Sequence, residues 1–95
     1  MIERHVAFEV FPDKCQDFED FIHHKYRPAM AKMVGFINVG LLRQQELPNN
    51  YKMIIRFNSV EEAAGWRNSD AHQALQPKLK SLYRNLQLTV YDVIS

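Results

Sequence analysis

Residues 51–66 read YKMIIRFNSVEEAAGW, and the hydrophobic pattern changes in the middle of this stretch. Apolar side chains occupy every second position from Tyr51 to Phe57, which is typical of a β-strand with one buried face. Ser59 and Glu62 then match the S-x-x-E capping box, in which the serine hydroxyl accepts a hydrogen bond from a free amide at the helix start. The stretch therefore predicts a strand that leads directly into a helix.

The same two periodicities recur on both sides of this stretch. In chain order, we expect a strand over 6–11, a helix over 13–33, strands over 36–45 and 51–57, a helix that starts at 59 and starts again at 68–70, and a strand over 86–94. This order is that of the α+β, ferredoxin-like βαββαβ fold, with a four-stranded antiparallel sheet and helices on one face.

Pro28 interrupts the first helical pattern. A proline inside a helix lacks a backbone donor and disfavours helical geometry in the residue before it. We therefore expect a kink or two short helices, with Arg27 pushed out of helical geometry.

Length and composition predict one domain over residues 1–95. Lys plus Arg is 12 and Asp plus Glu is 11, so the net charge of +1 argues against a nucleic-acid partner, which needs an excess of basic residues. No apolar run is long enough to span a membrane. Mixed charge within the first five residues is unlike a secretory signal. These features predict a cytoplasmic protein without a membrane or nucleic-acid partner.

Apolar or aromatic side chains also stand on the second face of several expected strands, opposite the main apolar row. They are Phe11, Leu42, Ile54, Tyr91 and Val93. A sheet that is apolar on both faces in so small a chain has to be covered on the side without helices. We therefore expect a homodimer that packs sheet against sheet.

Nucleotide-binding, P-loop, serine-hydrolase and zincin motifs are absent from the chain. The adjacent His23 and His24 point in different directions on a helix, so they are expected to be solvated and no metal site is predicted. Arg56 is expected to contact a carboxylate across the sheet, such as that of Glu9 or Asp92.

His72 differs from the other histidines because it falls on the leucine stripe that faces the sheet. An imidazole there is either a hydrogen-bonded core residue or a base lining a pocket, since neutral histidine suits proton abstraction near pH 7. Trp66, the only tryptophan, is either a core aromatic or a pocket wall. The helix break at Asn68 and Ser69 allows Trp66 and His72 to converge.

Two further polar candidates remain. Asn38 interrupts an otherwise apolar strand and either orients a ligand group or pairs with backbone. Tyr26 is expected to pack against other side chains, and we include it among candidate substrate-binding residues with Trp66 and Asn38.

Two stretches carry a family resemblance. The first is Pro28-Ala29-Met30 through Val34-Gly35-Phe36-Ile37, and the second runs from Asn58 through Trp66 to His72. Both are similar to the antibiotic biosynthesis monooxygenase (ABM) domain family of dimeric α+β barrel proteins. The order of elements resembles that family over nearly the whole chain, whereas the specific motifs span about fifteen residues.

The resemblance implies a homodimer with a pocket between sheet and helices in each subunit. Some members oxygenate aromatic phenols or quinols with O2 and without metal or flavin. The residues that match the family motif are Trp66 and His72. The resemblance therefore implies that His72 is the base, that Trp66 forms a wall of the pocket, and that the reaction needs no cofactor. The alternative is a non-enzymatic protein of the stress-responsive type that binds a small hydrophobic ligand.

A haem-degrading branch of the family places an asparagine on the first strand and an axial histidine on the last helix. Here His5, Val6 and Ala7 occupy the first-strand region, and Gln76 stands near the place of the histidine. These departures argue against haem degradation.

Overall fold

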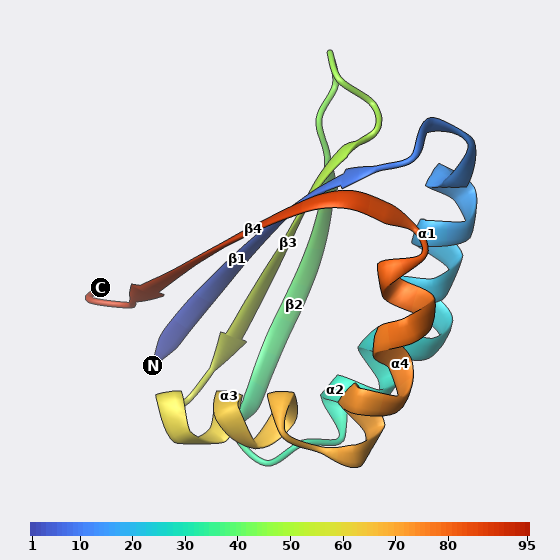
Figure 1. Ribbon diagram of the computed structural model, residues 1–95. Coiled ribbons are helices and arrows are strands. Elements are labelled where there is room, and N and C mark those ends of the chain that lie inside the picture. Colours follow the sequence, from blue (N-terminus) through green and yellow to red (C-terminus); the bar gives the residue numbers. More distant parts are fainter.

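The computed structural model describes residues 1–95 and shows a four-stranded sheet with helices on one face (Figure 1). The strands are β1 (Ile2–Val10), β2 (Phe36–Arg43), β3 (Asn50–Phe57) and β4 (Tyr83–Asp92). They lie in the order β2-β3-β1-β4, and each neighbouring pair is antiparallel. The ferredoxin-like α+β fold predicted from the order of elements is confirmed.

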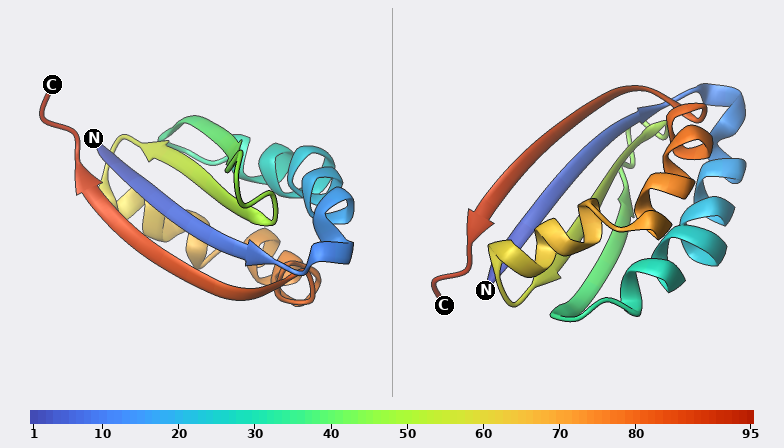
Figure 2. Two further views of the ribbon diagram at one scale, coloured as in Figure 1. Left: turned by 90° about the horizontal axis from the view of Figure 1, so that it is seen from above. Right: turned by 60° about the horizontal axis from the view of Figure 1, so that its bottom comes forward.

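Two helical segments connect the strands. Between β1 and β2 lie η1 (Pro12–Lys14), α1 (Cys15–Phe21), η2 (Ile22–Tyr26) and α2 (Arg27–Ala31), and between β3 and β4 lie α3 (Val60–Arg67) and α4 (Asp70–Lys80). Both views in Figure 2 show the helices on the same side of a curved sheet, with the two chain ends close together. None of the helices is both long and apolar enough to cross a membrane.

Serine caps start both helices of the second connection. The hydroxyl of Ser59 accepts a hydrogen bond from the amide of Glu62 at 3.1 Å and donates one to the Glu62 carboxylate at 3.0 Å. The hydroxyl of Ser69 accepts one from the amide of His72, also at 3.1 Å. Each bond satisfies an amide that has no partner inside its helix, so the chain can end α3 and begin α4 within three residues.

The expected displacement of Arg27 from helical geometry is wrong. Arg27 has φ −58° and ψ −49°, and its amide donates to the carbonyl of Ile22, five residues back. The segment η2 is therefore a π-helix inside a continuous helical stretch. In an α-helix the ring of Pro28 would press against the carbonyl of His24, and the wider π turn relieves this contact. The proline changes the type of helix and leaves the stretch unbroken.

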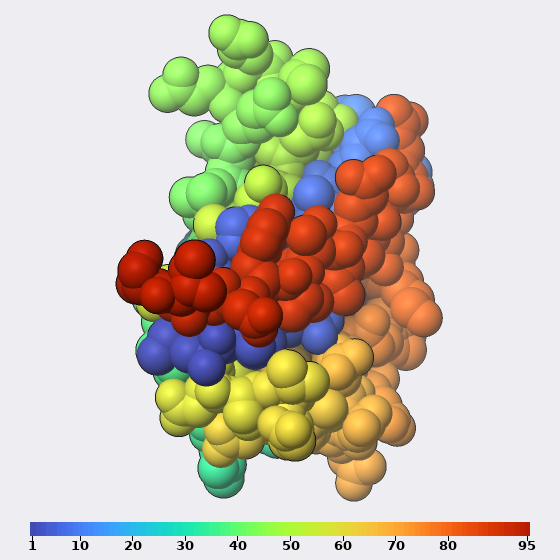
Figure 3. All heavy atoms as spheres, turned by 90° about the vertical axis from the view of Figure 1, so that its left-hand side faces the viewer, coloured from blue at the N-terminus to red at the C-terminus, as the bar shows by residue number.

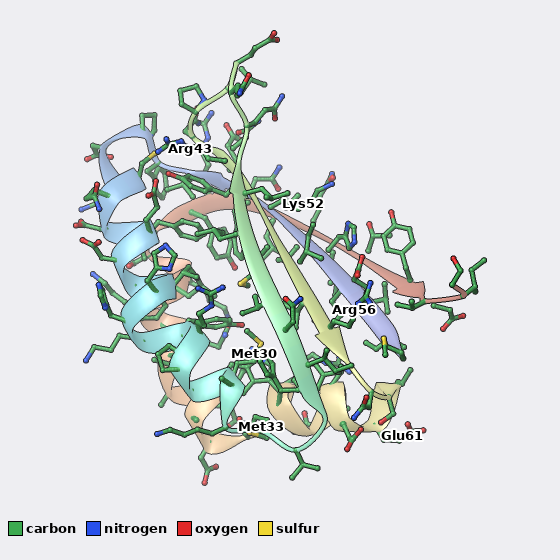
Figure 4. All side chains as sticks on the ribbon, turned by 180° about the vertical axis from the view of Figure 1, so that it is seen from behind. Met30, Met33, Arg43, Lys52, Arg56 and Glu61 are labelled. Carbon is green, nitrogen blue, oxygen red and sulfur yellow. The ribbon has the colours of Figure 1, made fainter.

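The core lies between the sheet and the helices and contains only apolar and aromatic residues. Alternate side chains of β1 point into it, namely Ile2, Val6, Phe8 and Val10. Met30 lies fully buried between α2 and the sheet (Figure 4). The alternating burial confirms the period-two prediction for β1.

The face of the sheet without helices carries charged side chains. Lys52 and Arg56 project from it, away from the helices (Figure 4). A guanidinium nitrogen of Arg56 donates to the Glu3 carboxylate at 2.6 Å, so Arg56 does contact a carboxylate across the sheet, although the residue is Glu3 and not Glu9 or Asp92. The physical reason is the register, which places Glu3 directly opposite Arg56 on the neighbouring strand.

Apolar side chains on this open face are fewer than the sequence indicated. Leu42, Ile54 and Tyr91 do lie on it, and Leu42 and Tyr91 are 54% and 50% exposed. Phe11 and Val93 instead follow the ends of β1 and β4. The open face is thus a mixture of apolar and charged side chains.

Strand β4 is an edge strand that the helices do not cover. Leu86, Leu88 and Val90 lie on its helix-facing side, opposite β1, and are 37%, 44% and 50% exposed. Figure 3 shows β4 running uncovered across the surface, beside α3. We call these three residues the β4 strip, which leaves the interior side of the sheet open along one edge.

Candidate functional site

A pocket of about 210 Å³ lies between the β4 strip and the helices α3 and α4. Strand β1 forms its floor, and η2 contributes one aromatic side chain. Its lining is largely apolar, with four polar side chains from three elements: Arg4, Arg67, His72 and Gln76. Such a pocket, apolar with a few convergent polar groups, is the usual form of a small-molecule site.

Three of the predicted site residues meet in this pocket. The ring centroids of Trp66 and His72 are 5.0 Å apart, those of Tyr26 and Trp66 are 5.4 Å apart, and those of Tyr26 and His72 are 6.1 Å apart. All three pairs are edge-to-face, an arrangement that aromatic rings favour. Trp66 lies in the last turn of α3 and His72 in the first turn of α4, so the break at Asn68 and Ser69 brings them together.

The two ring nitrogens of His72 have different surroundings. Nε2 lies 3.0 Å from the side-chain amide nitrogen of Gln76, one helical turn further along α4. Nδ1 is buried and has no hydrogen-bond partner. Unpaired buried nitrogens are rare in folded proteins and occur where a catalytic group or a water molecule has a place. The amide nitrogen of Gln76 can only donate, so Nε2 accepts from it and holds the lone pair of the neutral imidazole, while Nδ1 carries the hydrogen. Nε2 is therefore the atom of His72 that can accept a proton.

Burial lowers the pKa of His72 below its ordinary value of 6.5. The backbone of Arg67 acts in the opposite direction, and the positive charges of Arg4 and Arg67 lower the pKa further. The imidazole is therefore neutral at pH 7, which is the state a general base requires.

Tyr26 is buried, with 5% of its surface exposed. Burial raises the pKa of its phenol above the ordinary value of 10.0, partly offset by hydrogen bonding to Trp66 and by the charge of Arg4. The hydroxyl is therefore protonated at neutral pH and is available as a hydrogen-bond donor.

Asn38 does not line this pocket. It is exposed on β2, opposite Arg56 of β3, and borders a shallow hollow with Arg27 and Phe36. Asn38 alternates with the buried Val39 and pairs with Arg56, so its amide lies on the face of the sheet without helices. The structure therefore separates Asn38 from His72, Trp66 and Tyr26.

The other histidines lie elsewhere. His23 and His24 are exposed on η2, as expected, and His5 lies 2.8 Å from the Glu3 carboxylate on the face without helices. No three His, Cys, Asp or Glu side chains lie close enough together to hold a metal ion.

A second hollow, of about 480 Å³, opens on the face of the sheet without helices. Its lining includes Glu9, Arg43, Lys52 and Gln87, which are mostly solvated. It contains neither an aromatic cluster nor a histidine, so the smaller pocket is the better candidate for chemistry.

Comparison with models of known protein families identifies the family of the chain. The family model described as antibiotic biosynthesis monooxygenase matches residues 1–78. The chain belongs to the ABM family. That match includes every residue of the Tyr26, Trp66 and His72 cluster. No curated protein matches the chain in sequence.

Solved structures of similar fold include proteins described in ABM terms. A putative antibiotic biosynthesis monooxygenase from Bordetella bronchiseptica is 21% identical, with a TM-score of 0.88 over 99% of this chain and 97% of that one. SnoaB, described as a cofactor-independent oxygenase from Streptomyces nogalater, is 16% identical, with a TM-score of 0.89 over 99% of this chain and 93% of that one. At these identities the likeness confirms the ABM fold.

Sequence reasoning did not select several pocket residues. Arg4 stands at an inward position of β1, between Ile2 and Val6, and this charged residue in an apolar row was a signal that could have been noticed. Gln76 follows His72 by four residues, which places it on the same helix face. The role of Arg67 depends on the direction of the chain after α3, for which the sequence has no local signal.

Proposed function

We propose that this protein is a cofactor-independent monooxygenase that uses O2 to oxidise a small aromatic phenol or quinol. The observation that carries this proposal is the neutral imidazole of His72, placed beside Trp66 and Tyr26 in a largely apolar pocket. Membership of the ABM family supports the reaction class.

In the proposed reaction, His72 accepts the proton of a substrate hydroxyl. The resulting phenolate is electron-rich enough to reduce O2 itself, and a new carbon–oxygen bond forms at a ring carbon that bears hydrogen. Cleavage of the O–O bond and loss of that hydrogen as a proton give a quinone and water. The substrate supplies all the electrons, so the protein contributes a base, orientation and a site from which water is largely excluded.

The size of the pocket favours a substrate with a single ring. An apolar cavity of about 150 Å³ accommodates benzene, so a pocket of about 210 Å³ accommodates one substituted ring. Trp66 forms a rigid wall, and the Tyr26 hydroxyl is a donor for a substrate oxygen. We propose that His72 is the base and that Trp66 and Tyr26 bind the substrate.

A second subunit is part of the proposal. The apolar side chains Leu42, Ile54 and Tyr91 on the open face, and the β4 strip on the other side of the sheet at its edge, support a homodimer, because exposed apolar groups favour a partner of the same kind.

Oxygen consumption with a panel of hydroquinones and phenols tests the activity. We expect His72→Ala to lower the rate at least a hundredfold, since a positioned general base contributes about that much or more. The matched control is His24→Ala, which removes an exposed histidine from η2 and should leave the rate unchanged. Full oxygen consumption by a folded His72→Ala variant would contradict the role of His72.

The second candidate is a protein that binds a small hydrophobic ligand without turnover. The largely apolar lining favours it, because such a lining binds a small apolar ligand whether or not His72 takes up a proton. This candidate predicts binding of a phenol to the pocket with no oxygen consumption by wild-type protein.

A further inference from the structure

The chain has six arginines, and four of them have a partner within the protein. Arg27 donates to the carbonyl of Val39, and the other three bind carboxylates: Arg43 with Glu19, Arg56 with Glu3, and Arg84 with Glu9. Arg4 and Arg67 have neither a hydrogen-bond partner nor an ion-pair partner. Both of these unpaired guanidinium groups line the pocket that contains His72.

Arg4 occupies a position that the fold otherwise fills with apolar side chains. It lies on the helix-facing side of β1, between Ile2 and Val6, and opposite Ile55 of β3 and Val90 of β4. Placing a cation there without a carboxylate is unfavourable, because the charge loses water and gains no counter-charge. Consistent with this environment, burial lowers the pKa of Arg4, and the charge of Arg67 lowers it further.

Arg67 brings a second positive charge to the same place. It is the last residue of α3, directly after Trp66, and is exposed at the rim of the pocket. No aspartate or glutamate lines the pocket. Two cations and a neutral base thus surround an apolar space that has no negative charge of its own.

We propose that the pocket takes an aromatic phenol that carries a carboxylate, held by Arg4 and Arg67 while its hydroxyl faces His72. The proposal deepens the proposed oxygenase function, on which the role of His72 rests. Guanidinium groups bind carboxylates through paired, charge-assisted hydrogen bonds, and such bonds gain strength in a site poor in water. A carboxylate supplies the counter-charge that the chain lacks, and the ring fills the space beside Trp66.

The test measures binding without turnover. Trp66 is the only tryptophan and lines the pocket, so its fluorescence reports a bound ring. Under nitrogen, the protein is titrated with para-hydroxybenzoate, with its meta isomer, and with the corresponding hydroxybenzamides, which have nearly the same shape and no charge. We expect at least one acid to bind ten or more times more tightly than its amide, and the difference to shrink as salt is added.

Two substitutions test whether Arg4 and Arg67 cause the difference in affinity between the acid and the amide. Arg4→Met keeps a long apolar stem and removes the charge, and we expect it to weaken binding of the acid about tenfold while leaving the amide unchanged. Arg67→Met, at an exposed position where folding is not at risk, should do the same to a smaller degree. Arg84→Met is the matched control, because Arg84 is bound to Glu9 away from the pocket, and it should have no effect.

Equal affinity for acid and amide would overturn the inference, and so would an absence of binding by all four compounds. Competition by inorganic phosphate as strong as that by the acid would overturn the assignment to an aromatic carboxylate and indicate a general anion site. Preference for the acid without oxygen consumption by any hydroxybenzoate or hydroquinone would leave the inference standing and defeat the oxygenase proposal. Oxidation of neutral hydroquinone without any preference for the acid over its amide would overturn the inference and support the oxygenase proposal.

Discussion

The imidazole of His72 responds to its neighbours through charge. Burial and the guanidinium groups of Arg4 and Arg67 all disfavour its protonated form, so a change at either arginine is also a change in the basicity of the histidine. The same two arginines are proposed to bind the substrate carboxylate. A bound anion would offset their charge and raise the pKa of His72, which makes the base stronger when the substrate is present.

This coupling predicts the pH dependence of the reaction. A general base works in its neutral form, so kcat/KM measured with a neutral hydroquinone should rise with pH through the pKa of free His72, with a midpoint below 6.5. Arg4→Met removes a nearby positive charge and should move the midpoint upward. Arg84→Met should keep the wild-type midpoint. A profile with no acidic limb, or a midpoint in Arg4→Met below that of wild type, would contradict the assignment.

How far the site follows from the sequence depends on the residue. His72 was predictable as an inward-facing histidine because it shares a stripe with Leu75 and Leu79. Its meeting with Trp66 was left open, because helical spacing fixes angles only within one helix and the chain changes direction between α3 and α4. Asn38 lies elsewhere because it alternates with the buried Val39, whereas His72 faces the other side of the sheet, and the period-two pattern of β2 already indicates this separation.

At the level of the helices, the first turn of α4 affects both the stability of the protein and the position of the proposed base. The hydroxyl of Ser69 holds the amide of His72 itself, so this cap fixes the backbone that carries the proposed base. Ser69→Ala should lower the free energy of unfolding by about 1 kcal/mol, the usual cost of a lost cap. It should also lower kcat with the hydroquinone panel.

Ser59→Ala provides the comparison, because it removes the cap of α3 at the far end from the pocket. We expect a similar loss of stability, measured by urea unfolding, with a smaller effect on kcat. Equal effects of the two substitutions on kcat would show that the Ser69 cap has no special influence on His72.

The order and type of the elements followed from periodicity alone, whereas their details did not. The first strand begins at Ile2 rather than Val6, because Glu3, Arg4 and His5 conceal its alternation. The helix through Pro28 stays continuous, because a π turn gives the proline ring the space it needs.

For the whole molecule, the exposed apolar groups predict the state of assembly. Light scattering should report about twice the chain mass of 11.2 kDa. Ile54→Lys places a charge near the middle of the open face, where Ile54 lies between His5 and Gly40 of the neighbouring strands, and should shift the protein toward a monomer. The control Val60→Lys alters an exposed apolar residue on α3 and should leave the mass unchanged. A wild-type mass of one chain would contradict the proposed homodimer.

Leu86 and Leu88 belong at once to the wall of the pocket and to the uncovered edge strand. A second subunit that covers this edge strand also covers one side of the bound aromatic ring. Association of the subunits and binding of the ligand are therefore thermodynamically coupled. Linkage is reciprocal, so a ligand that gains from the shield must tighten association to the same degree that association tightens the ligand. The affinity of the protein for the aromatic acid should then rise with protein concentration and fall when the protein is diluted.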